Sequence, residues 1–488
     1  MFLEKLNIPI ALTFDDVLLE PRASEVEPNQ VDVRTRFSKH INLNIPLVSA
    51  AMDTVSRSDL AIALARVGGI SVIHRNMSPD MEAEEIRIAK REARLIERKV
   101  LTVTSDATIA DVGNILHMHG IGGVPVLEND KVVGIVSRRD MQGFAFKGGH
   151  ESIKTIMTKN PITAHEAITA EEAFEQMYIN KVERLPIVDE KGFLLGIISM
   201  QEILDKKQYP DAIRDPHGGL RVAASVGPFD LERAHLLEDA GADAIVVDCA
   251  HGHNMNVVRS VEEIKGSLSC DVIAGNIATS TAAEDLLKAD VDGLKVGIGP
   301  GSICTTRVVA GVGVPQITAI ASVAEIARPC DVPVIGDGGI RFSGDIAKAI
   351  AAGADSVMIG NLFAGTAEAP GHVVTMQGRK YKRYRGMGSL GVMSTGVSSD
   401  RYFQKKDIGK TKFVPEGVEG VTPYVGTVSD VIYQLVGGLK SAMGYTGSAT
   451  IADMHQKACF VRISAAGYKE SHPHSILITN EAPNYRVD

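Results

Sequence analysis

A glycine-rich stretch that carries a cysteine and two threonines has the composition of a reactive loop. The segment GLKVGIGPGSICTTR (293–307) begins as an apolar run and ends beyond Cys304 with Thr305 and Thr306. A cysteine placed there acts as a nucleophile, as a metal ligand or as a packing residue. Zinc is disfavoured because no His or Cys cluster accompanies Cys304. A free thiol has a pKa near ~8.5, and backbone amides with a neighbouring cation would raise its thiolate fraction, so nucleophile and packing residue both stay open.

Two further glycine clusters follow apolar runs and could hold a phosphate. The string GDGGIR places Asp337, Gly338 and Gly339 after one run, and Gly360 and Asn361 follow the next. Backbone N–H groups of glycines can approach a phosphate closely. Either cluster alone is also typical of a plain tight turn, but the two together favour a phosphate site.

Short β-rich runs alternate with helical patterns along most of the chain and would position these loops. Eight βα units that close on themselves make a TIM barrel, and an open doubly wound sheet is the alternative. In a TIM barrel the site lies at the C-terminal ends of the strands, and the loops after strands seven and eight often hold phosphate. Cys304 would then follow strand six, beside both glycine clusters. The expected strands are residues 46–52, 70–74, 221–227, 244–249, 271–277, 293–298, 333–339 and 356–360.

One gap of about 146 residues separates the second expected strand from the third, too many for a single βα crossover. Inside it, residues 123–140 align with residues 184–202 at a period near 61. Two copies indicate a duplicated module rather than a solenoid. We therefore expect an α/β barrel with an inserted two-repeat α+β domain. The expected boundaries are 1–92 and 213–488 for the barrel, 93–150 and 153–212 for the repeats, and about 380–425 for a mobile flap.

Composition excludes several classes of protein. A net charge of −9, from 51 basic and 60 acidic residues, argues against a dedicated nucleic-acid site. No stretch is long and apolar enough for a membrane span, and we read no signal peptide at the N-terminus. The five cysteines are odd in number and lack CxxC spacing, which fits neither a disulfide framework nor a zinc site. A reducing, cytoplasmic location is expected. The polar, glycine-rich region 371–430 is interpreted as a solvated loop or as a lid over the site.

Several motifs stand in the order seen in the IMP dehydrogenase family, which this chain resembles along nearly its whole length. They are GIGPGSICTTR, GDGGIR, YRGMGS, RYFQ, VPEGVEG and ESHPHS, together with the opening LTFDDVLL and a pair of CBS-type repeats in the gap. The related GMP reductases share much of the string around Cys304. The resemblance implies a (β/α)8 barrel with an inserted CBS (Bateman) domain. It also implies NAD⁺-dependent oxidation of inosine 5′-monophosphate (IMP) to xanthosine 5′-monophosphate, the committed step of guanine nucleotide synthesis.

The resemblance also assigns roles in the reaction. Cys304 would attack carbon C2 of the hypoxanthine ring, the adduct would give its hydride to the nicotinamide, and a thioimidate would remain on sulfur until water hydrolyses it. Arg401, assisted by Tyr402, looks like the base for that water. Because a guanidinium is ordinarily protonated, this role needs a dry site or a transient neutral fraction. Thr306 with Glu416 offers a second proton relay, and the sequence does not rank the two.

Binding residues follow from the same motifs. The implied substrate set is Ser302, Asp337, Gly338, Gly339, Gly360, Asn361, Tyr384, Arg385, Gly386, Met387, Gly388 and Glu416. The implied NAD⁺ set is Asp248, Cys249, Ala250, Asn276, Gly297, Ile298 and Gly299. For K⁺ the resemblance implies the carbonyls of Gly299, Gly301 and Cys304, with Glu470, Ser471 and His472 of the partner subunit. A homotetramer is thus expected, or an octamer through the CBS-type domain, with purine nucleotides such as ATP or GTP bound there.

This chain departs from the family's pattern at a few positions. Cys249 and Ala250 stand where small hydroxyl residues are frequent, and Asn361 replaces a more usual Ser or Gly. In the repeats, Asp140 is the residue type that holds a ribose, whereas the second copy offers Glu202. Nucleotide regulation is therefore expected more clearly for the first repeat.

Two rival functions have to be weighed. A GMP reductase would share Cys304 and the phosphate site but would run a reductive deamination. The inserted repeats and the Arg401–Tyr402 pair favour the dehydrogenase. A nucleotide-sensing regulatory protein on an inactive barrel is the other rival, and it is disfavoured because Cys304, Thr306, Arg401 and Tyr402 are all retained.

Overall fold

The computed structural model describes residues 4–6, 8–91, 96, 98, 100–118, 121–141, 150–394 and 413–485, the side chains of 202 and 206 excepted. The chain divides into two compact units. The first comprises Met1–Lys90, Asp211–Asp215 and Leu220–Asp488, and the second comprises Arg91–Pro210 and Pro216–Gly219.

The first unit is built around a closed barrel of eight parallel strands, in the order β12-β13-β14-β15-β16-β17-β4-β5. Its strands are almost wholly buried, as expected for a parallel sheet covered by helices. The TIM-barrel prediction is confirmed, and each of the eight expected runs contains one strand. They are β4 (Leu47–Ser49), β5 (Ile70–Ile73), β12 (Ala223–Val226), β13 (Ala244–Asp248), β14 (Asp271–Ile277), β15 (Gly293–Val296), β16 (Val334–Asp337) and β17 (Ser356–Ile359).

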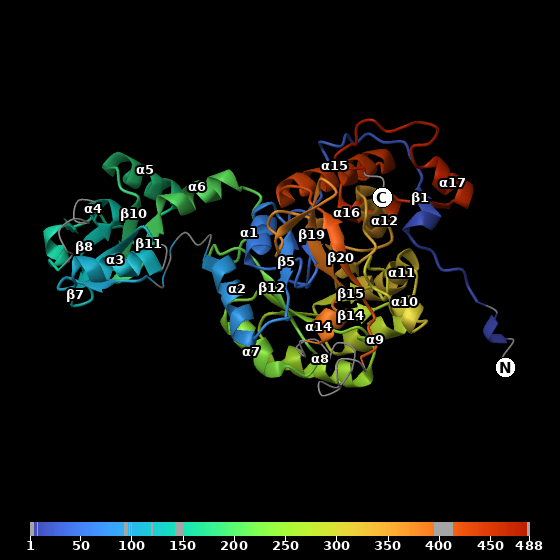
Figure 1. Ribbon diagram of the computed structural model, residues 1–488, viewed down its shortest axis with the longest axis horizontal. Helices are drawn as coiled ribbons and strands as arrows, with labels where there is room; N and C mark the ends of the chain where they lie inside the picture. The colour runs from blue at the N-terminus through green and yellow to red at the C-terminus, as the bar shows by residue number, and fades with distance from the viewer. Residues whose placement is uncertain are drawn as a thin grey trace. The chain divides into compact units, whose positions relative to one another are not determined.

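Amphipathic helices surround the barrel (Figure 1). Their apolar residues recur at helical spacing and face the strands, as in α9, where Ala282, Ala283 and Leu286 are buried. The helices are α1 (Ser58–Arg66), α2 (Pro79–Arg91), α7 (Leu231–Asp239), α8 (Met255–Ser267), α9 (Ser280–Lys288), α10 (Thr306–Val309), α11 (Gln316–Ala327), α12 (Ser343–Ala351), α13 (Asn361–Ala364), α14 (Leu390–Met393), α15 (Val428–Thr446), α16 (Ile451–Lys457) and α17 (Ala465–Glu470). Short 3₁₀ turns are η1 (Glu4–Leu6), η2 (Phe14–Asp16) and η5 (Arg328–Cys330).

Aspartates tie three pairs of barrel strands together at their amino ends. Each stands at or just before the start of one strand, and its carboxylate accepts a hydrogen bond from an amide at the start of the preceding strand, at 2.8 Å. The pairs are Asp243 with Val222, Asp292 with Val272 and Asp355 with Val334. As a result β12 is joined to β13, β14 to β15 and β16 to β17, at the end of the barrel opposite the predicted site.

A buried lysine lies where the chain leaves the first unit and pairs with two aspartates near the point where the chain returns to it. Lys90 Nζ lies 2.9 Å from Asp215 Oδ2 and 2.5 Å from Asp243 Oδ2, and its side chain is only 4% exposed. An ammonium paired to two carboxylates in this way compensates for its desolvation. The junction is therefore closed by contacts within the first unit.

The polar region 371–430 is not a loop throughout, which corrects that interpretation. It contains a three-stranded antiparallel sheet of β18 (Val373–Met376), β19 (Arg379–Arg385) and β20 (Glu419–Pro423). Lys382 and Tyr384 are buried and alternate with residues that are half-buried or exposed, so the basic run RKYKRYR carries a strand periodicity. Two smaller sheets pair β1 (Val17–Leu19) with β21 (Phe460–Arg462) and β2 (Thr35–Arg36) with β3 (Asn42–Leu43).

The second unit contains the sequence repeat, which folds twice into the same hairpin. In the first copy Pro125 pairs with Ile135, and in the second Pro186 pairs with Ile197. Each copy has its own apolar core. The strands are β6 (Val103–Thr104), β7 (Gly123–Glu128), β8 (Lys131–Ser137), β9 (Thr158–Lys159), β10 (Arg184–Val188) and β11 (Leu194–Ser199). The helices are α3 (Ile109–Met118), α4 (Arg138–Met141), η4 (Ile153–Thr155), α5 (Ala170–Asn180) and α6 (Met200–Gln208).

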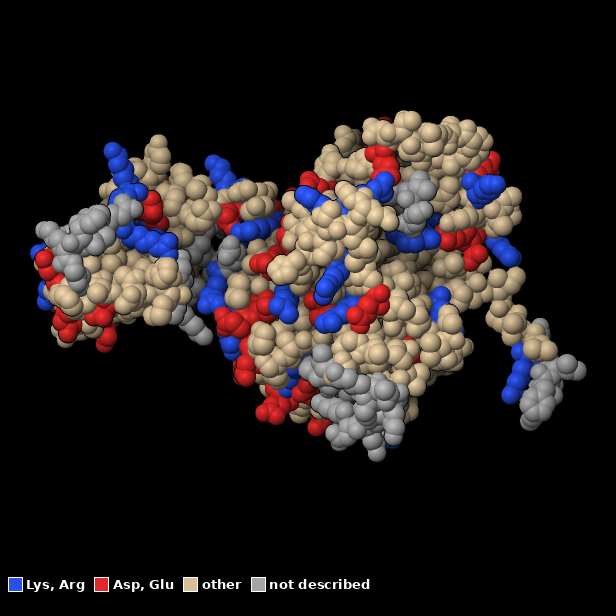
Figure 2. All heavy atoms as spheres, in the orientation of Figure 1, with Lys and Arg blue, Asp and Glu red and all other residues tan. Residues whose placement is uncertain are grey.

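The surface carries mixed charge. Figure 2 shows Lys and Arg side chains interspersed with Asp and Glu over the visible face of each unit. Within the described ranges, no helix has the length and apolar character needed to cross a membrane.

Candidate active site

A cavity at the carboxyl ends of the barrel strands collects most of the predicted site residues. It is open to solvent on one side, and the space within it and at its mouth amounts to about 830 Å³. A second hollow adjoins it and shares Pro300, Gly301, Gly338, Met358 and Tyr384. The predicted residues that line the first are Asp248, Ala250, Asn276, Gly297, Ile298, Gly299, Gly301, Cys304, Thr306, Asp337, Gly338, Tyr384, Gly386, Met387, Gly388 and Glu416. Those that line the second are Gly301, Ser302, Gly338, Gly339, Gly360, Asn361 and Tyr384.

Cys304 lies at the wall of the first cavity, half-buried and beside a hydroxyl. Its Sγ is 3.2 Å from Thr306 Oγ1, and its backbone N–H donates to the Gly301 carbonyl at 3.0 Å. A distant segment holds this loop in place, because the Thr305 amide donates to the Glu416 carbonyl at 2.9 Å. Cys304 and Gly417 face each other in an isolated antiparallel bridge. The thiol thus lies where the loop after β15 meets the chain returning toward β20.

Glycine is required where this loop approaches β16. A Cβ on Gly297 would lie 2.1 Å from the Asp337 carbonyl oxygen, so no larger residue fits without displacing that strand end. Gly338 and Gly339 have φ of +92° and +84°, a left-handed conformation that glycine adopts without strain. Consecutive amides in such a conformation can face a phosphate.

Lys295 is a site residue that the sequence reasoning missed. Its side chain is 2% exposed, and Nζ donates to Asp248 Oδ1 at 2.9 Å and to Asp337 Oδ2 at 3.1 Å, with a third bond to Asn276 Oδ1. Asn276 Nδ2 also donates to Asp337 Oδ2, at 2.8 Å. The available signal was a lone charged residue inside the otherwise apolar strand GLKV, since a fully buried lysine needs partners.

Tyr384 joins the two hollows. Its hydroxyl lies next to Gly360, where an added Cβ would be 2.8 Å from the hydroxyl oxygen. Burial raises the pKa of Tyr384 to about 12, while a hydrogen bond with Ser302 opposes that rise. The hydroxyl therefore remains protonated at neutral pH and is available as a hydrogen-bond donor.

Arg385 does not line either hollow, because Asp53 holds its guanidinium. Nη2 lies 2.5 Å and Nε 3.0 Å from Asp53 Oδ2, and Asn76 Nδ2 donates to the same oxygen at 2.6 Å. His74, which is fully buried, accepts the Asn76 amide N–H on Nδ1 at 3.1 Å. Burial lowers the pKa of His74 to about 3, so the ring is neutral. This network joins the ends of β4 and β5 to β19 beside the cavity.

The remaining predicted residues lie elsewhere. Cys249 is fully buried, with Sγ 3.7 Å from the His251 carbonyl, and it lines neither hollow. Glu470, Ser471 and His472 lie at and just beyond the end of α17, the first two exposed. Arg401 and Tyr402 fall outside the described residues.

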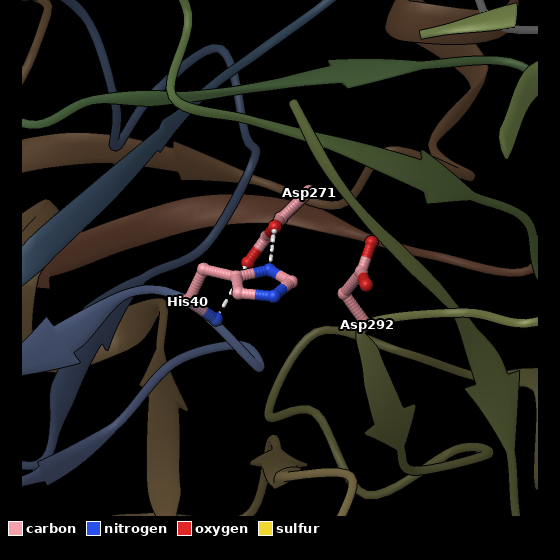
Figure 3. Close-up of side chains that lie close together, drawn as sticks. All are labelled: His40, Asp271 and Asp292. Atoms are coloured by element: carbon pink, nitrogen blue, oxygen red, sulfur yellow. Dashed lines mark hydrogen bonds and ion pairs between the residues drawn. The ribbon is translucent and has the colours of Figure 1, made fainter. Parts of the chain in front are cut away.

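One group of side chains in the described ranges has metal-ligand geometry, and it lies at the opposite end of the barrel from the cavity. His40 Nδ1 is 2.7 Å from Asp271 Oδ1, and Asp292 stands beside them (Figure 3). Asp292 Oδ2 already accepts from Lys265 Nζ at 2.6 Å and from the Val272 amide at 2.8 Å. Because that ammonium supplies the compensating charge, we interpret the group as a structural ion-pair cluster.

The fold and the cavity define a TIM-barrel enzyme with a cysteine in the cavity at the carboxyl ends of its strands. The family profile described as "IMP dehydrogenase / GMP reductase domain" matches residues 11–474, and the chain belongs to this family. The inosine-5′-monophosphate dehydrogenase of Methanocaldococcus jannaschii is 54% identical over 99% of both chains. That of Aquifex aeolicus is 53% identical, again over 99% of both.

A solved relative comes from the other branch of the family. The crystal structure of a GMP reductase from Trypanosoma brucei in complex with guanosine 5′-monophosphate superimposes with a TM-score of 0.88 at 38% identity. It covers 97% of this chain and 100% of that chain. A match of that extent includes the second unit, so the inserted repeats do not distinguish a dehydrogenase from a reductase. The prediction that the inserted repeats favour a dehydrogenase over a reductase was therefore wrong.

Proposed function

We propose that this enzyme oxidises IMP to xanthosine 5′-monophosphate with NAD⁺ and water, the committed step of guanine nucleotide synthesis. The observation that carries the proposal is the position of Cys304. Its thiol faces a cavity that also presents Asp337, and that cavity adjoins the hollow lined by Gly338, Gly339 and Gly360. A purine nucleotide whose phosphate occupies the second hollow would place its base in the first. Relatives that are 53% and 54% identical to this chain over 99% of its length are inosine-5′-monophosphate dehydrogenases.

The reaction follows from these residues. Cys304 Sγ would form a bond to C2 of the base while the C2=N3 double bond opens and N3 takes up the thiol proton, so that C2 becomes tetrahedral. The hydride would then leave C2 for the nicotinamide, the acceptor that NAD⁺ supplies when bound, and N3 would release its proton. The resulting thioimidate on Cys304 is hydrolysed by water, which breaks the C–S bond, returns the thiol and leaves oxygen on C2. Asp337 would hold the ribose hydroxyls during both steps, and Tyr384, a protonated donor, would position the substrate between the two hollows.

Two groups of this chain are proposed to remove the proton from the attacking water. Thr306 Oγ1 stands 3.2 Å from Cys304 Sγ, and Glu416 lines the same cavity, which supports their relay. Arg401 with Tyr402 is assigned by family resemblance. Arg401→Ala is expected to give a burst of NADH followed by slow turnover, because only hydrolysis is impaired. Loss of the burst itself would contradict that role.

NAD⁺ is proposed to bind along Asp248, Ala250, Asn276 and the segment Gly297–Gly299, where the cavity opens beside Cys304. All of these residues line the first cavity together with Cys304. K⁺ is proposed at the carbonyls of Gly299, Gly301 and Cys304, since carbonyl oxygen is a hard ligand. Glu470, Ser471 and His472 of the partner subunit would complete the site in a tetramer, which the exposure of Glu470 and Ser471 permits.

The second unit is proposed to be a pair of CBS modules that bind purine nucleotides such as ATP or GTP, and through which tetramers could form octamers. Two matching hairpins with separate cores support this assignment. Asp140 Oδ2 accepts from the Ser137 amide at 2.8 Å, which fixes the carboxylate that would meet a ribose. The five cysteines form no disulfide with one another, which fits a reducing, cytoplasmic compartment.

The deciding experiment compares IMP with NAD⁺ against GMP with NADPH. We expect NADH formation in the first mixture and no NADPH consumption in the second, whereas the reverse would make the enzyme a GMP reductase. Cys304→Ala should abolish turnover, and normal turnover in that variant would refute covalent catalysis. Cys330→Ala is the matched control, because Cys330 is exposed and lines neither hollow.

A further inference from the structure

Lys295 is a buried cation between two residues that serve different ligands. Its strand, β15, is apolar apart from this side chain, which is 2% exposed. Removing an ammonium from water costs several kcal/mol, so its partners must be well placed. Those partners are Asp248 at the end of β13 and Asp337 at the end of β16, at 2.9 and 3.1 Å from Nζ.

The two carboxylates share this one ammonium. Asn276 completes the group, since its Oδ1 accepts from Lys295 and its Nδ2 donates to Asp337 Oδ2 at 2.8 Å and to the Gly297 carbonyl at 2.7 Å. Two carboxylates with one cation leave a net charge of −1. A ligand that hydrogen-bonds to one carboxylate therefore changes how strongly the ammonium is held by the other.

The backbone around Lys295 is closely packed against the neighbouring strands. A Cβ on Gly275 would lie 2.5 Å from the Lys295 carbonyl oxygen, which shows how closely β14 packs against β15. Gln316 Nε2 donates to the carbonyls of Val296 and Asp337, at 2.9 and 3.1 Å. The strand ends on both sides of the ammonium are thereby held in register.

We propose that Lys295 is a positioning residue that couples the substrate ribose site to the cofactor site. The proposal rests on the proposed function, in which Asp337 binds the ribose of IMP and Asp248 lies in the NAD⁺ site. Ribose hydroxyls that donate to Asp337 reduce its hold on the ammonium. Lys295 then bonds more strongly to Asp248 and fixes that carboxylate for the cofactor. Binding of IMP thus tightens binding of NAD⁺, and the reverse follows by thermodynamic linkage.

The test measures this coupling directly in the full-length Cys304→Ser protein, which binds both ligands without turnover. Calorimetry gives the Kd of NAD⁺ with and without saturating IMP. We expect a ratio of about tenfold, in the usual range for coupled sites. Lys295→Met should reduce it several-fold because the shared cation is lost, and only the part that comes from direct contact between the two ligands should remain. A mere loss of stability would weaken binding without changing the ratio.

Lys90→Met is the matched control, since it also removes a buried lysine shared by two aspartates, Asp215 and Asp243, at the other end of the barrel. It should lower the unfolding temperature but keep the ratio. If Lys295→Met does not fold, Lys295→Gln retains a hydrogen-bonding group without the charge and should also reduce the ratio several-fold. A ratio near one before Lys295 is changed, or an unchanged ratio in either folded Lys295 variant, overturns the proposal. Turnover of IMP by the unaltered enzyme tests the proposed function separately.

Discussion

Replacement of Gly297 by alanine tests the geometry that joins the Cys304 loop to the substrate site. The new Cβ would lie 2.1 Å from the Asp337 carbonyl oxygen, whereas ordinary van der Waals contact begins near 3.4 Å. The loop and the end of β16 must therefore separate by about 1.3 Å. Asn276 Nδ2, which donates to the Gly297 carbonyl, would be displaced with them.

The expected cost is large in catalysis and moderate in stability. A misplacement of about 1 Å can lower the rate about 100-fold, which corresponds to roughly 2.7 kcal/mol of transition-state stabilisation. Overpacking should lower the free energy of unfolding by about 1–3 kcal/mol. NADH absorbance under IMP and NAD⁺ gives kcat/KM, and circular dichroism shows whether the variant remains folded.

The matched control is Gly266→Ala, because Gly266 lies in α8 with no heavy atom within 4 Å of the added Cβ. It should retain full activity and gain about 0.5–1 kcal/mol of stability, the usual effect of alanine over glycine in a helix. A folded Gly297→Ala enzyme with kcat/KM within about threefold of the parent would refute the reasoning, since a displacement of that size should cost far more.

Three other perturbations follow from the structure. Burial keeps His74 neutral in the folded protein, with a pKa of about 3, whereas in the unfolded chain the imidazole takes up a proton below pH 6.5. Through this group the free energy of unfolding therefore falls by about 1.4 kcal/mol for each pH unit below 6.5. Unfolding followed against pH should show a shallower slope in His74→Gln, and identical slopes would contradict the assignment. Asp53→Asn should lower the free energy of unfolding by about 2 kcal/mol, between the values typical of exposed and of buried ion pairs. It should also raise KM for IMP, because the ion pair with Asp53 lets Arg385 anchor β19 beside Tyr384. An unchanged KM would exclude that anchoring role. Replacing K⁺ by a larger organic cation should lower turnover, whereas indifference to the cation would remove the proposed ion site.

The barrel and the position of Cys304 could be predicted from sequence because each depends on local patterns. Eight apolar runs mark the parallel strands, and the rule that sites lie at the carboxyl ends of strands brought Asp337 and Gly360 together before any contact was known. The sheet formed by β18, β19 and β20 was missed for a physical reason. Its inward residues include Lys382, whose ammonium is buried by bonding to backbone carbonyls, and such a residue is read as exposed in a sequence.

Long-range contacts were the other limit. The bridge between Cys304 and Gly417 and the ion pair between Asp53 and Arg385 join segments more than a hundred residues apart. No spacing in the sequence indicates which side chains meet across such distances. Lys295 left a local signal, a charge in a buried strand, but its partners come from three other strands and only the fold identifies them.

The aspartates at the amino ends of the barrel bear on how an insertion of more than a hundred residues could be accommodated. Asp243, Asp292 and Asp355 bind six of the eight strands into consecutive pairs, and β4 with β5 form the fourth. The chain leaves the barrel after β5 and re-enters before β12, and these two strands pair directly with each other. Lys90 closes that joint through Asp215 and Asp243. The insertion therefore leaves every strand pair of the closed barrel intact, including the pair of β5 with β12 on either side of it.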